Sequence, residues 1–294
     1  MKFSLWPTAS HPPAEILAEV RQADAEGWYG VWLADHYMPN TADGAPADGP
    51  VHEAWSLLPA VAAATERVRI GTLVSPTSVH HPALLASRAA TIDHLSEGRM
   101  VLGLGAGWQV NEHAAYGIEL EPPGPRVTRF EESIQIVRSL LTEQRTTFHG
   151  KVYDFEDAPC DPKPIQDRLP IVVGSKSPRM LRILASHADE WNTWGTPAAA
   201  AESLQLLIAA CEQVGRDPGA MHRSVNAVVR LDGEPLPGRP SIGGSAAQLV
   251  DQIGQYAEAG YDEFIVNGMS FDGHAAKRSE TISRLRNEVF AQLG

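Results

Sequence analysis

Cysteine is scarce in this chain of 294 residues: it has only Cys160 and Cys211, which lie far apart and lack the spacing of metal ligands. Their scarcity excludes a disulfide framework and predicts a reducing compartment, so we expect a cytoplasmic protein. Long hydrophobic runs are also missing, and no stretch reaches the length that spans a bilayer. Residues 1–6 lead directly into a strand-like segment rather than a signal peptide, so we expect no membrane partner.

Positive charge is in deficit. The chain has 24 lysines and arginines against 36 aspartates and glutamates, which gives a formal net charge of −12. This balance argues against nucleic acid or an anionic membrane as the main partner, although a local basic pocket could still hold a phosphate. Hydrophobic residues make up 43% and charged residues 20%, which is typical of a globular protein.

Several catalytic signatures are absent. The chain has no H-E-x-x-H zinc motif, no G-x-S-x-G nucleophile turn and no phosphate-binding P-loop, so we predict no metal site and no hydrolase or NTPase activity of these types. The dinucleotide fingerprint G-x-G-x-x-G also fails, because its last glycine would fall at Trp108 or at Val110. The same stretch belongs to the fourth strand–helix unit rather than the first, which argues further against a nicotinamide-binding fold.

The chain contains strand-like and helix-like segments in regular alternation. Eight such pairs along one chain predict a (β/α)8 TIM barrel that forms a single domain over residues 1–294, with a doubly wound open sheet as the alternative. We expect an irregular insert over residues 109–128, a hairpin over 148–155, and loops at 37–52 and 233–244. The predicted strands are 2–6, 30–34, 68–74, 100–104, 171–173, 190–193, 224–229 and 263–266; the predicted helices are 14–26, 53–65, 82–95, 129–141, 178–185, 198–214, 246–259 and 276–293.

Three glycines mark the end of the fourth strand, at Gly103, Gly105 and Gly107. Alternate positions of a strand face the same side, so these glycines strip one face of its side chains. A flat ring system or a phosphate can then approach the backbone closely. On its own this pattern is weak evidence for a binding site, and it gains weight only together with the residues at the other strand ends.

In a (β/α)8 barrel the active site forms where the strands end. His36 follows the second strand directly after Asp35 and is a candidate proton donor or acceptor, with a purely structural histidine as the alternative. The turn Gly174-Ser175-Lys176-Ser177 opens a helix, where free N–H groups and the helix dipole favour an anion. Ser177 could instead cap that helix, and the two roles are compatible. We interpret His80 and His81 as structural, because neither has a partner at metal-ligand spacing.

Seven segments form a recognisable set: W-L-A-D-H at 32–36, R-I-G-T-L-V at 69–74, D-H-L-S-E-G-R at 93–99, G-L-G-A-G-W at 103–108, E-H-A-A-Y-G-I at 112–118, P-K-P-I-Q at 162–166 and A-D-E-W-N at 188–192. In the expected order, and over about residues 2–290, they resemble the luciferase-like flavin monooxygenase superfamily. Within it the chain is most similar to the oxidoreductases that use the deazaflavin coenzyme F420. The resemblance implies a bacterial luciferase-like TIM barrel with insertions at its C-terminal face, where a bent tricyclic cofactor binds.

The resemblance also implies roles for individual residues. His36 matches the family's candidate acid/base, and Asp35 matches a residue that contacts the deazaflavin ring. Leu73 and Val74 match a position where relatives carry a non-prolyl cis peptide behind the central ring. The remaining positions implied for cofactor binding are Gly105, Gly107, Trp108 and Asn111 around the ring and ribityl chain, and Gly174, Ser175 and Ser177 at the phosphate.

Trp108 departs from the family pattern, because relatives that oxidise glucose 6-phosphate have a glutamate at this position. A tryptophan makes the pocket more apolar than a carboxylate would. With Trp6, Trp191 and Trp194 expected nearby, the sequence predicts an apolar or partly aromatic substrate rather than a sugar phosphate.

The function predicted from the sequence is hydride transfer between coenzyme F420 and a small organic substrate, such as a ketone, an imine or an activated double bond. One alternative is an FMN-dependent monooxygenase that uses oxygen and flavin reduced by a partner enzyme. Another is a flavin-binding protein without turnover. We further expect a homodimer, and a flavin or F420 reductase as the supplier of reduced cofactor.

Overall fold

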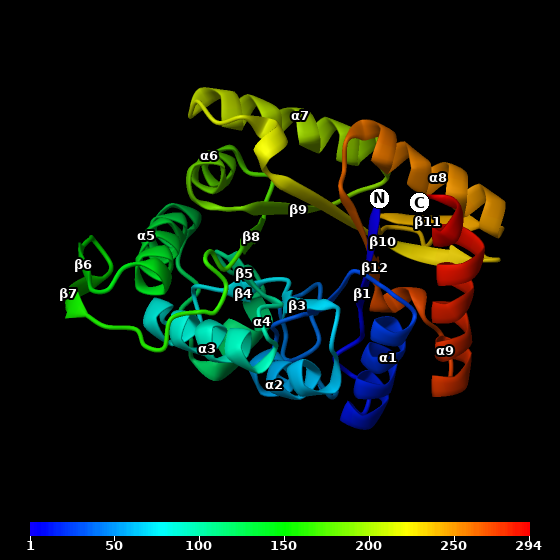
Figure 1. Cartoon of the computed structure of the whole chain (residues 1–294), viewed down its shortest axis with the longest axis horizontal. Coiled ribbons are helices and arrows are strands. Elements are labelled where there is room, and N and C mark those ends of the chain that lie inside the picture. Colours follow the sequence, from blue (N-terminus) through cyan, green and yellow to red (C-terminus); the bar gives the residue numbers. More distant parts are fainter.

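A computed structural model describes all of residues 1–294 and shows parallel strands closed into a barrel (Figure 1). The last barrel strand pairs in parallel with the first, Lys2 opposite Glu263 through Trp6 opposite Asn267, and this pairing closes the barrel. The strands in order around it are β1 (Lys2–Trp6), β2 (Gly30–Leu33), β3 (Arg69–Thr72), β5 (Met100–Gly105), β8 (Ile171–Gly174), β9 (Glu190–Trp194), β10 (His222–Leu231) and β12 (Glu263–Asn267).

A ring of helices surrounds the strands, which confirms the predicted (β/α)8 TIM barrel (Figure 1). The apolar sides of these helices pack against the outward-facing side chains of the strands in one continuous core. Phe3 of β1, for example, stacks on Phe290 with ring centroids 4.0 Å apart. The ring consists of α1 (Pro13–Ala25), α2 (Ala54–Ala64), α3 (Pro82–Leu95), α5 (Pro123–Thr142), α6 (Pro178–His187), α7 (Pro197–Gln213), α8 (Ala246–Ala259) and α9 (Ala275–Arg284).

Smaller elements lie between these units. Two short strands extend barrel strands at the C-terminal end, because β4 (Ser75–Pro76) pairs with β5 and β11 (Ser241–Gly244) pairs with β10. The predicted hairpin is present as antiparallel β6 (Thr146–His149) and β7 (Asp154–Ala158). The remaining elements are α4 (Val110–Tyr116), the 3₁₀ turns Pro218–Ala220, Gly268–Ser270 and Phe290–Gln292, and the π-helical turn Leu285–Val289.

The expectation of an irregular insert over 109–128 is wrong. Residues Val110–Tyr116 form α4, which ends at Gly117 in a left-handed conformation (φ 67°). Helix α5 already begins at Pro123, because prolines are tolerated in a first turn whose N–H groups have no partners within the helix. The Pro-Pro-Gly-Pro stretch therefore starts a helix rather than preventing one.

Three other predicted boundaries also need correction. The third strand ends at Thr72 instead of Val74, and the cis peptide between Leu73 and Val74 lies between its end and β4. The closing helix is regular only as far as Arg284 and continues as π and 3₁₀ turns. The segment 233–244 is not loop throughout, since β11 occupies its end.

Glycines inside the barrel allow neighbouring strands to approach each other. A Cβ atom on Gly103 would lie 1.9 Å from the carbonyl oxygen of Thr72, and one on Gly71 would lie 2.2 Å from that of Val101. Either contact is far below any van der Waals separation. Side chains of Trp32, Leu73, Val101, Val172 and Ile265 form a separate buried cluster between these strands.

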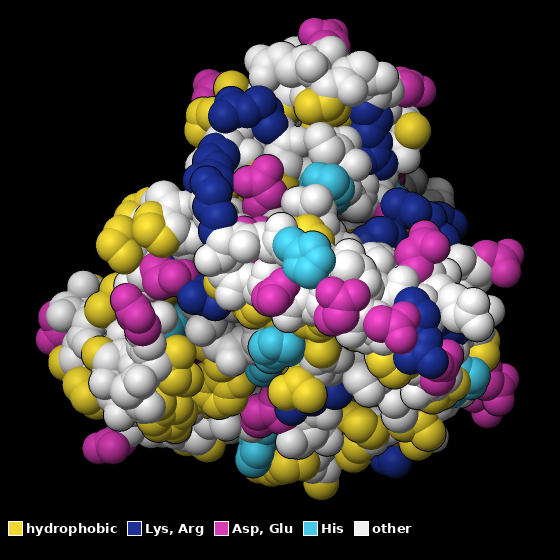
Figure 2. Space-filling view, turned by 90° about the vertical axis from the view of Figure 1, so that its left-hand side faces the viewer, with side chains coloured by type: hydrophobic (Ala, Val, Ile, Leu, Met, Phe, Trp, Pro, Cys, Tyr) yellow, Lys and Arg dark blue, Asp and Glu magenta, His cyan; other side chains and the backbone are white.

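The surface shows no field of one sign on the face that carries the β6–β7 hairpin. Figure 2 shows basic and acidic side chains interspersed there, with hydrophobic side chains between them. None of the helices has both the length and the apolar character that a membrane span requires.

Candidate active site

A cavity of about 690 Å³ opens at the C-terminal ends of the barrel strands. Each barrel strand from β1 to β12 contributes residues at its end or in the segment that follows it, as the fold requires of an active site. The lining residues are Trp6, His36, Leu73, Val74, Pro76, Trp108, Glu112, Gly174, Ser175, Lys176, Asn192, Thr193, Trp194, Gly238, Arg239, Pro240 and Met269.

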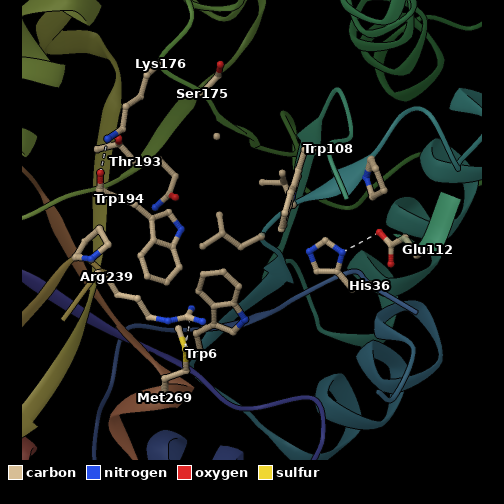
Figure 3. A pocket seen from close by; sticks show the side chains of 17 residues that line it. Trp6, His36, Trp108, Glu112, Ser175, Lys176, Thr193, Trp194, Arg239 and Met269 are labelled. Atoms are coloured by element: carbon tan, nitrogen blue, oxygen red, sulfur yellow. Dashed lines mark hydrogen bonds and ion pairs between the residues drawn. The ribbon is translucent and has the colours of Figure 1, made fainter. Parts of the chain in front are cut away.

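His36 forms a pair with Glu112 at one side of this cavity (Figure 3). Nδ1 of His36 lies 2.9 Å from Oε1 of Glu112, and Oε2 of Glu112 accepts a hydrogen bond from the backbone N–H of Tyr37, also at 2.9 Å. The Glu112 side chain is 2% exposed, whereas that of His36 is 27% exposed. Nε2 of His36 has no hydrogen-bond partner in the protein, so it is the atom available to a bound molecule.

Asp35 does not line the cavity, although it precedes His36 in the sequence. Its side chain is fully buried and accepts hydrogen bonds from Ser75 Oγ at 2.6 Å and from Trp55 Nε1 at 3.0 Å. His80 Nε2 lies 2.9 Å from the same oxygen, Oδ2. Burial alone would raise the pKa of Asp35, but His80, Ser75 and Trp55 together outweigh it and hold the pKa below its usual range.

This network gives His80 the structural role expected from the sequence, and it adds a carboxylate partner, Asp35, that the sequence did not predict. His80 is buried between Asp35 and the hydroxyl of Tyr37, which lies 3.3 Å from its Nε2. His81 also has a structural role, since its Nδ1 accepts a hydrogen bond from the backbone N–H of Ala83 at the start of α3. Through its contacts with Trp55, Ser75 and His80, Asp35 links three segments of the chain that lie behind the cavity wall.

Leu73 and Val74 form a wall of the cavity, and the expected cis peptide between them is confirmed. Two glycines, the last residue of β5 and a residue just after that strand, allow close packing around this wall. A Cβ on Gly105 would lie 2.7 Å from Cγ2 of Val74, and one on Gly107 (φ +92°) would lie 2.0 Å from Oγ of Ser78. Neither glycine lines the cavity directly; both allow the residues around them to pack closely.

The turn from Gly174 to Ser177 lies at the opposite side of the cavity from His36 (Figure 3). Gly174, Ser175 and Lys176 line the cavity, and Ser177 precedes α6, which has Pro178 at its first position. The Ser177 side chain makes no capping hydrogen bond, so its role as a helix cap is not supported.

Lys176 Nζ donates to the carbonyl oxygen of Trp194, and burial lowers the pKa of this lysine. The turn is held from beneath by Trp191, whose Nε1 donates to the carbonyl oxygen of Ser175 at 2.8 Å. Lys176, the Ser175 hydroxyl, which accepts from the Ser177 N–H at 3.3 Å, and the N-terminus of α6 together make this side of the cavity suited to an anion.

Three tryptophans line the cavity, and Trp191 is not one of them. Trp6 and Trp194 meet edge to face with centroids 5.7 Å apart, and Trp108 meets the ring of His36 in the same way at 5.5 Å. The expectation that Trp191 also faces the cavity is wrong, because its ring is fully buried and stacks on Tyr261. The wall between His36 and the anion-binding turn is therefore aromatic and largely apolar.

Asn111 lies outside the cavity as well. It is fully buried, and its Nδ2 donates to the carbonyl oxygen of Pro39 at 2.8 Å. Its Oδ1 has no partner. The structure thus brings His36, Leu73, Val74, Trp108, Gly174 and Ser175 together around the cavity, and places Asp35, Gly105, Gly107, Asn111 and Ser177 behind or beside it.

Sequence reasoning missed Glu112 and Arg239. Glu112 falls within the predicted irregular insert, and Arg239 falls within a predicted loop, so no periodic pattern placed either near His36. The only available signal for Glu112 was its place in the E-H-A-A-Y-G-I segment that resembles the superfamily.

A buried charge cluster lies at the opposite, N-terminal end of the barrel. Glu190, His222 and Glu263 bring possible ligand atoms within 4.8 Å of one another. Arg69 already contacts Glu190 there, and its Nη1 lies 4.0 Å from Oε2 of Glu263. Because this guanidinium supplies positive charge to both carboxylates, we assign no metal to the cluster.

The fold and the cavity define a (β/α)8 barrel with one site at the C-terminal ends of its strands. Residues 1–235 match the family described as luciferase-like monooxygenase, and the chain belongs to that family. A relative from Kineococcus radiotolerans, described as an F420-dependent glucose-6-phosphate dehydrogenase, is 31% identical over 227 residues, which cover 76% of this chain and 66% of that protein.

Solved structures of the same fold include enzymes of more than one kind. The coenzyme F420-dependent tetrahydromethanopterin reductase of Methanopyrus kandleri has a TM-score of 0.85 at 17% identity, and the match covers 100% of this chain and 99% of that one. The monooxygenase RslO1 of Streptomyces bottropensis has a TM-score of 0.81 at 21% identity, with 100% of each chain covered. At these identities the similarity establishes the fold.

Proposed function

We propose that this protein is an F420-dependent oxidoreductase that transfers hydride between the deazaflavin and a small organic substrate. One observation carries the proposal: a buried carboxylate orients His36 at one side of a cavity whose other side is an anion-binding turn. The relative from Kineococcus, described as F420-dependent, supports this choice of cofactor.

The residues present fit a cofactor with a flat ring and a phosphate. A volume of about 690 Å³ suits a ligand of this size. Leu73 and Val74 would contact the ring, while the backbone of Gly174 and Ser175 and the ammonium of Lys176 would hold the phosphate. Coenzyme F420, when bound, supplies hydride transfer at a ring carbon and does not readily activate oxygen.

His36 is the residue placed to exchange a proton with the substrate. With Nδ1–H donating to Glu112, the free Nε2 takes up or gives the proton on the cavity side. Glu112 fixes the ring orientation and this tautomer, as a buried carboxylate does for a catalytic histidine. Glu112 is therefore a positioning residue in this proposal.

The walls of the cavity favour an apolar or aromatic substrate. Trp6, Trp108 and Trp194 supply large flat surfaces, and the only carboxylate among the lining residues, Glu112, is already bound to His36 and to the Tyr37 backbone. A substrate with many hydroxyls would lose hydrogen bonds to water that the faces of these rings do not replace. We therefore propose a ketone, an imine or an activated double bond on an apolar body.

A fluorescence titration tests the cofactor. The apo-protein is titrated separately with coenzyme F420 and with FMN, and the emission of each cofactor and the quenching of protein tryptophan are followed. We expect tight binding of F420 and weak binding of FMN. Tight binding of FMN alone would favour the monooxygenase alternative, with a partner reductase, and binding of neither would refute the assignment of a flavin-type cofactor.

A matched pair of variants locates the phosphate. Lys176→Ala is expected to weaken F420 binding by about 10-fold, because it removes a charged partner of the phosphate. Lys151 is an exposed lysine in the β6–β7 turn, so Lys151→Ala serves as the control and should leave the affinity for F420 unchanged.

We also propose that the protein is a homodimer, which light scattering on the purified protein would test.

A further inference from the structure

Arg239 reaches the cavity from the segment between β10 and β11. This segment is fixed at both ends, since Val228 N–H donates to the Pro240 carbonyl at 3.0 Å and Asp232 N–H donates to the Gly244 carbonyl at 2.8 Å. Figure 3 shows the Arg239 side chain extending past Trp6 toward Met269. The backbone thus holds this arginine at the mouth of the barrel.

The guanidinium of Arg239 has no acidic partner. Its Nη1 donates to Sδ of Met269 at 3.4 Å, and no aspartate or glutamate forms an ion pair with it. Two other arginines near this segment are paired: Arg230 of β10 lies 2.6 Å from Asp272, and Arg284 of α9 lies 2.8 Å from Asp232. In a chain with 36 acidic and 24 basic residues, a guanidinium left unpaired at a cavity is available to an anion from outside.

Arg239 is separate from the anion-binding turn assigned to the cofactor phosphate. Lys176 and Ser175 lie along one edge of the cavity in Figure 3, whereas Arg239 lies beyond Trp194, beside Trp6. A ligand that spans from Leu73 and Val74 to the turn would leave Arg239 facing the remaining space, on the side of Trp6 and Met269.

We propose that Arg239 is a specificity-determining residue that binds a carboxylate on the substrate. This inference rests on the proposed function, because it divides the cavity into a cofactor part and a substrate part. A guanidinium matches a carboxylate with two parallel hydrogen bonds, which selects geometry as well as charge. Trp6 and Trp108 supply apolar surface, so the substrate class is an aromatic or otherwise apolar carboxylic acid that carries a reducible carbonyl group or double bond.

Two probe molecules of the same shape test this proposal. The quenching of tryptophan fluorescence by 4-acetylbenzoate and by its neutral analogue 4-acetylbenzamide is measured on the protein, with and without F420. We expect the carboxylate to bind about 10- to 100-fold more tightly than the amide, in the range of a charge-assisted hydrogen-bonded pair. Arg239→Gln should bring the two affinities within about 2-fold of each other, and Arg239→Lys should retain part of the preference.

Arg21→Gln, an exposed arginine on α1 without an ion pair, is the matched control and should keep the full preference. The proposal is overturned if the wild-type protein does not prefer the carboxylate, including binding of neither probe, or if Arg239→Gln leaves the preference intact. It is also overturned if Arg239→Gln weakens F420 binding, because the arginine would then belong to the cofactor. The titration of the wild-type protein with F420 tests the proposed function separately. A protein that binds no F420 can still prefer the carboxylate probe through Arg239.

Discussion

Nδ1 of His36 and Oε1 of Glu112 lie 2.9 Å apart, although 76 positions separate the two residues in the sequence. The second carboxylate oxygen is fixed by the backbone N–H of Tyr37, directly after the histidine. The Glu112 carboxylate is therefore bound to two consecutive residues, to the ring of His36 and to the backbone of Tyr37. A substitution at Glu112 that keeps an acceptor for the Tyr37 N–H can therefore remove the negative charge beside His36 and leave this backbone contact in place.

Glu112→Gln is expected to lower kcat by about 10- to 100-fold, because the amide still accepts from Tyr37 but no longer stabilises a protonated imidazole. Steady-state kinetics and an F420 titration on the same variant check this, and cofactor affinity should change little. Glu119→Gln is the control, since Glu119 is exposed and makes no side-chain hydrogen bond. A variant with unchanged kcat, or with F420 affinity reduced as much as kcat, would contradict the positioning role.

His36→Ala is expected to lower kcat by about 100- to 10,000-fold while F420 binding changes little, because only the proton-exchanging group is lost. Single-turnover rates and cofactor titrations on one preparation separate the two effects. If turnover and cofactor affinity fall together, His36 is a binding residue instead.

Much of the fold follows from the sequence, because each strand is a short apolar run and each helix has its own 3.6-residue period. Helix α3 is found at its predicted bounds, Pro82–Leu95, and α8 at Ala246–Ala259. The prolines at 122–125 predict an irregular insert, whereas α5 begins among them. Those prolines occupy a first helical turn, where they cost little.

The site is less predictable, because side chains at neighbouring positions of a strand point to opposite faces. Trp191 and Asn192 are neighbours within β9, yet Asn192 lines the cavity and Trp191 packs outside the barrel on Tyr261. Asp35 and His36 are also neighbours, yet Asp35 is buried in its hydrogen-bond network and His36 lines the cavity. Glu112 and Arg239 lie in segments whose direction depends on tertiary packing, so a local pattern could not place them.

Trp108→Glu tests the apolar character of the cavity. Trp108 is 57% exposed, so its replacement should change the melting temperature by only a few degrees. Binding of acetophenone, measured by quenching of the remaining tryptophans, should weaken by about 10-fold because an aromatic surface beside His36 is lost. Unchanged affinity for acetophenone would remove Trp108 as a determinant of substrate class.

Gly103→Ala is expected to destabilise the barrel by several kcal/mol or to prevent folding, because its Cβ would lie 1.9 Å from a backbone oxygen of the neighbouring strand. Gly124→Ala is the matched control: nothing lies within 4 Å of a Cβ there, but the position is in the first turn of α5 and precedes Pro125, so we expect a change below about 0.5 kcal/mol. Expression yield and thermal unfolding measure both. A folded Gly103→Ala protein with an unchanged melting temperature would contradict the close strand approach at this position.

His222 links stability to pH at the N-terminal end of the barrel. Burial lowers the pKa of this histidine, but the hydrogen bond to Glu263 at 2.8 Å, together with the charges of Glu263 and Glu190, raises the pKa above its ordinary value of 6.5. The folded state therefore holds the proton more tightly than the unfolded state. The resulting stabilisation is complete below pH 6.5 and is lost as pH rises through the raised pKa of the folded protein.

The free energy of unfolding of His222→Gln, compared with wild type in urea at pH 6 and at pH 9, tests this linkage. The variant should be less stable by about 1–3 kcal/mol at pH 6, because it removes a charged partner of the buried Glu263. The difference should shrink towards pH 9, because the wild-type histidine loses its proton as pH rises through its raised pKa. A gap that stays constant or widens between pH 6 and pH 9 would mean that His222 is not the titrating group, since only a proton held more tightly in the folded state gives a difference of this sign.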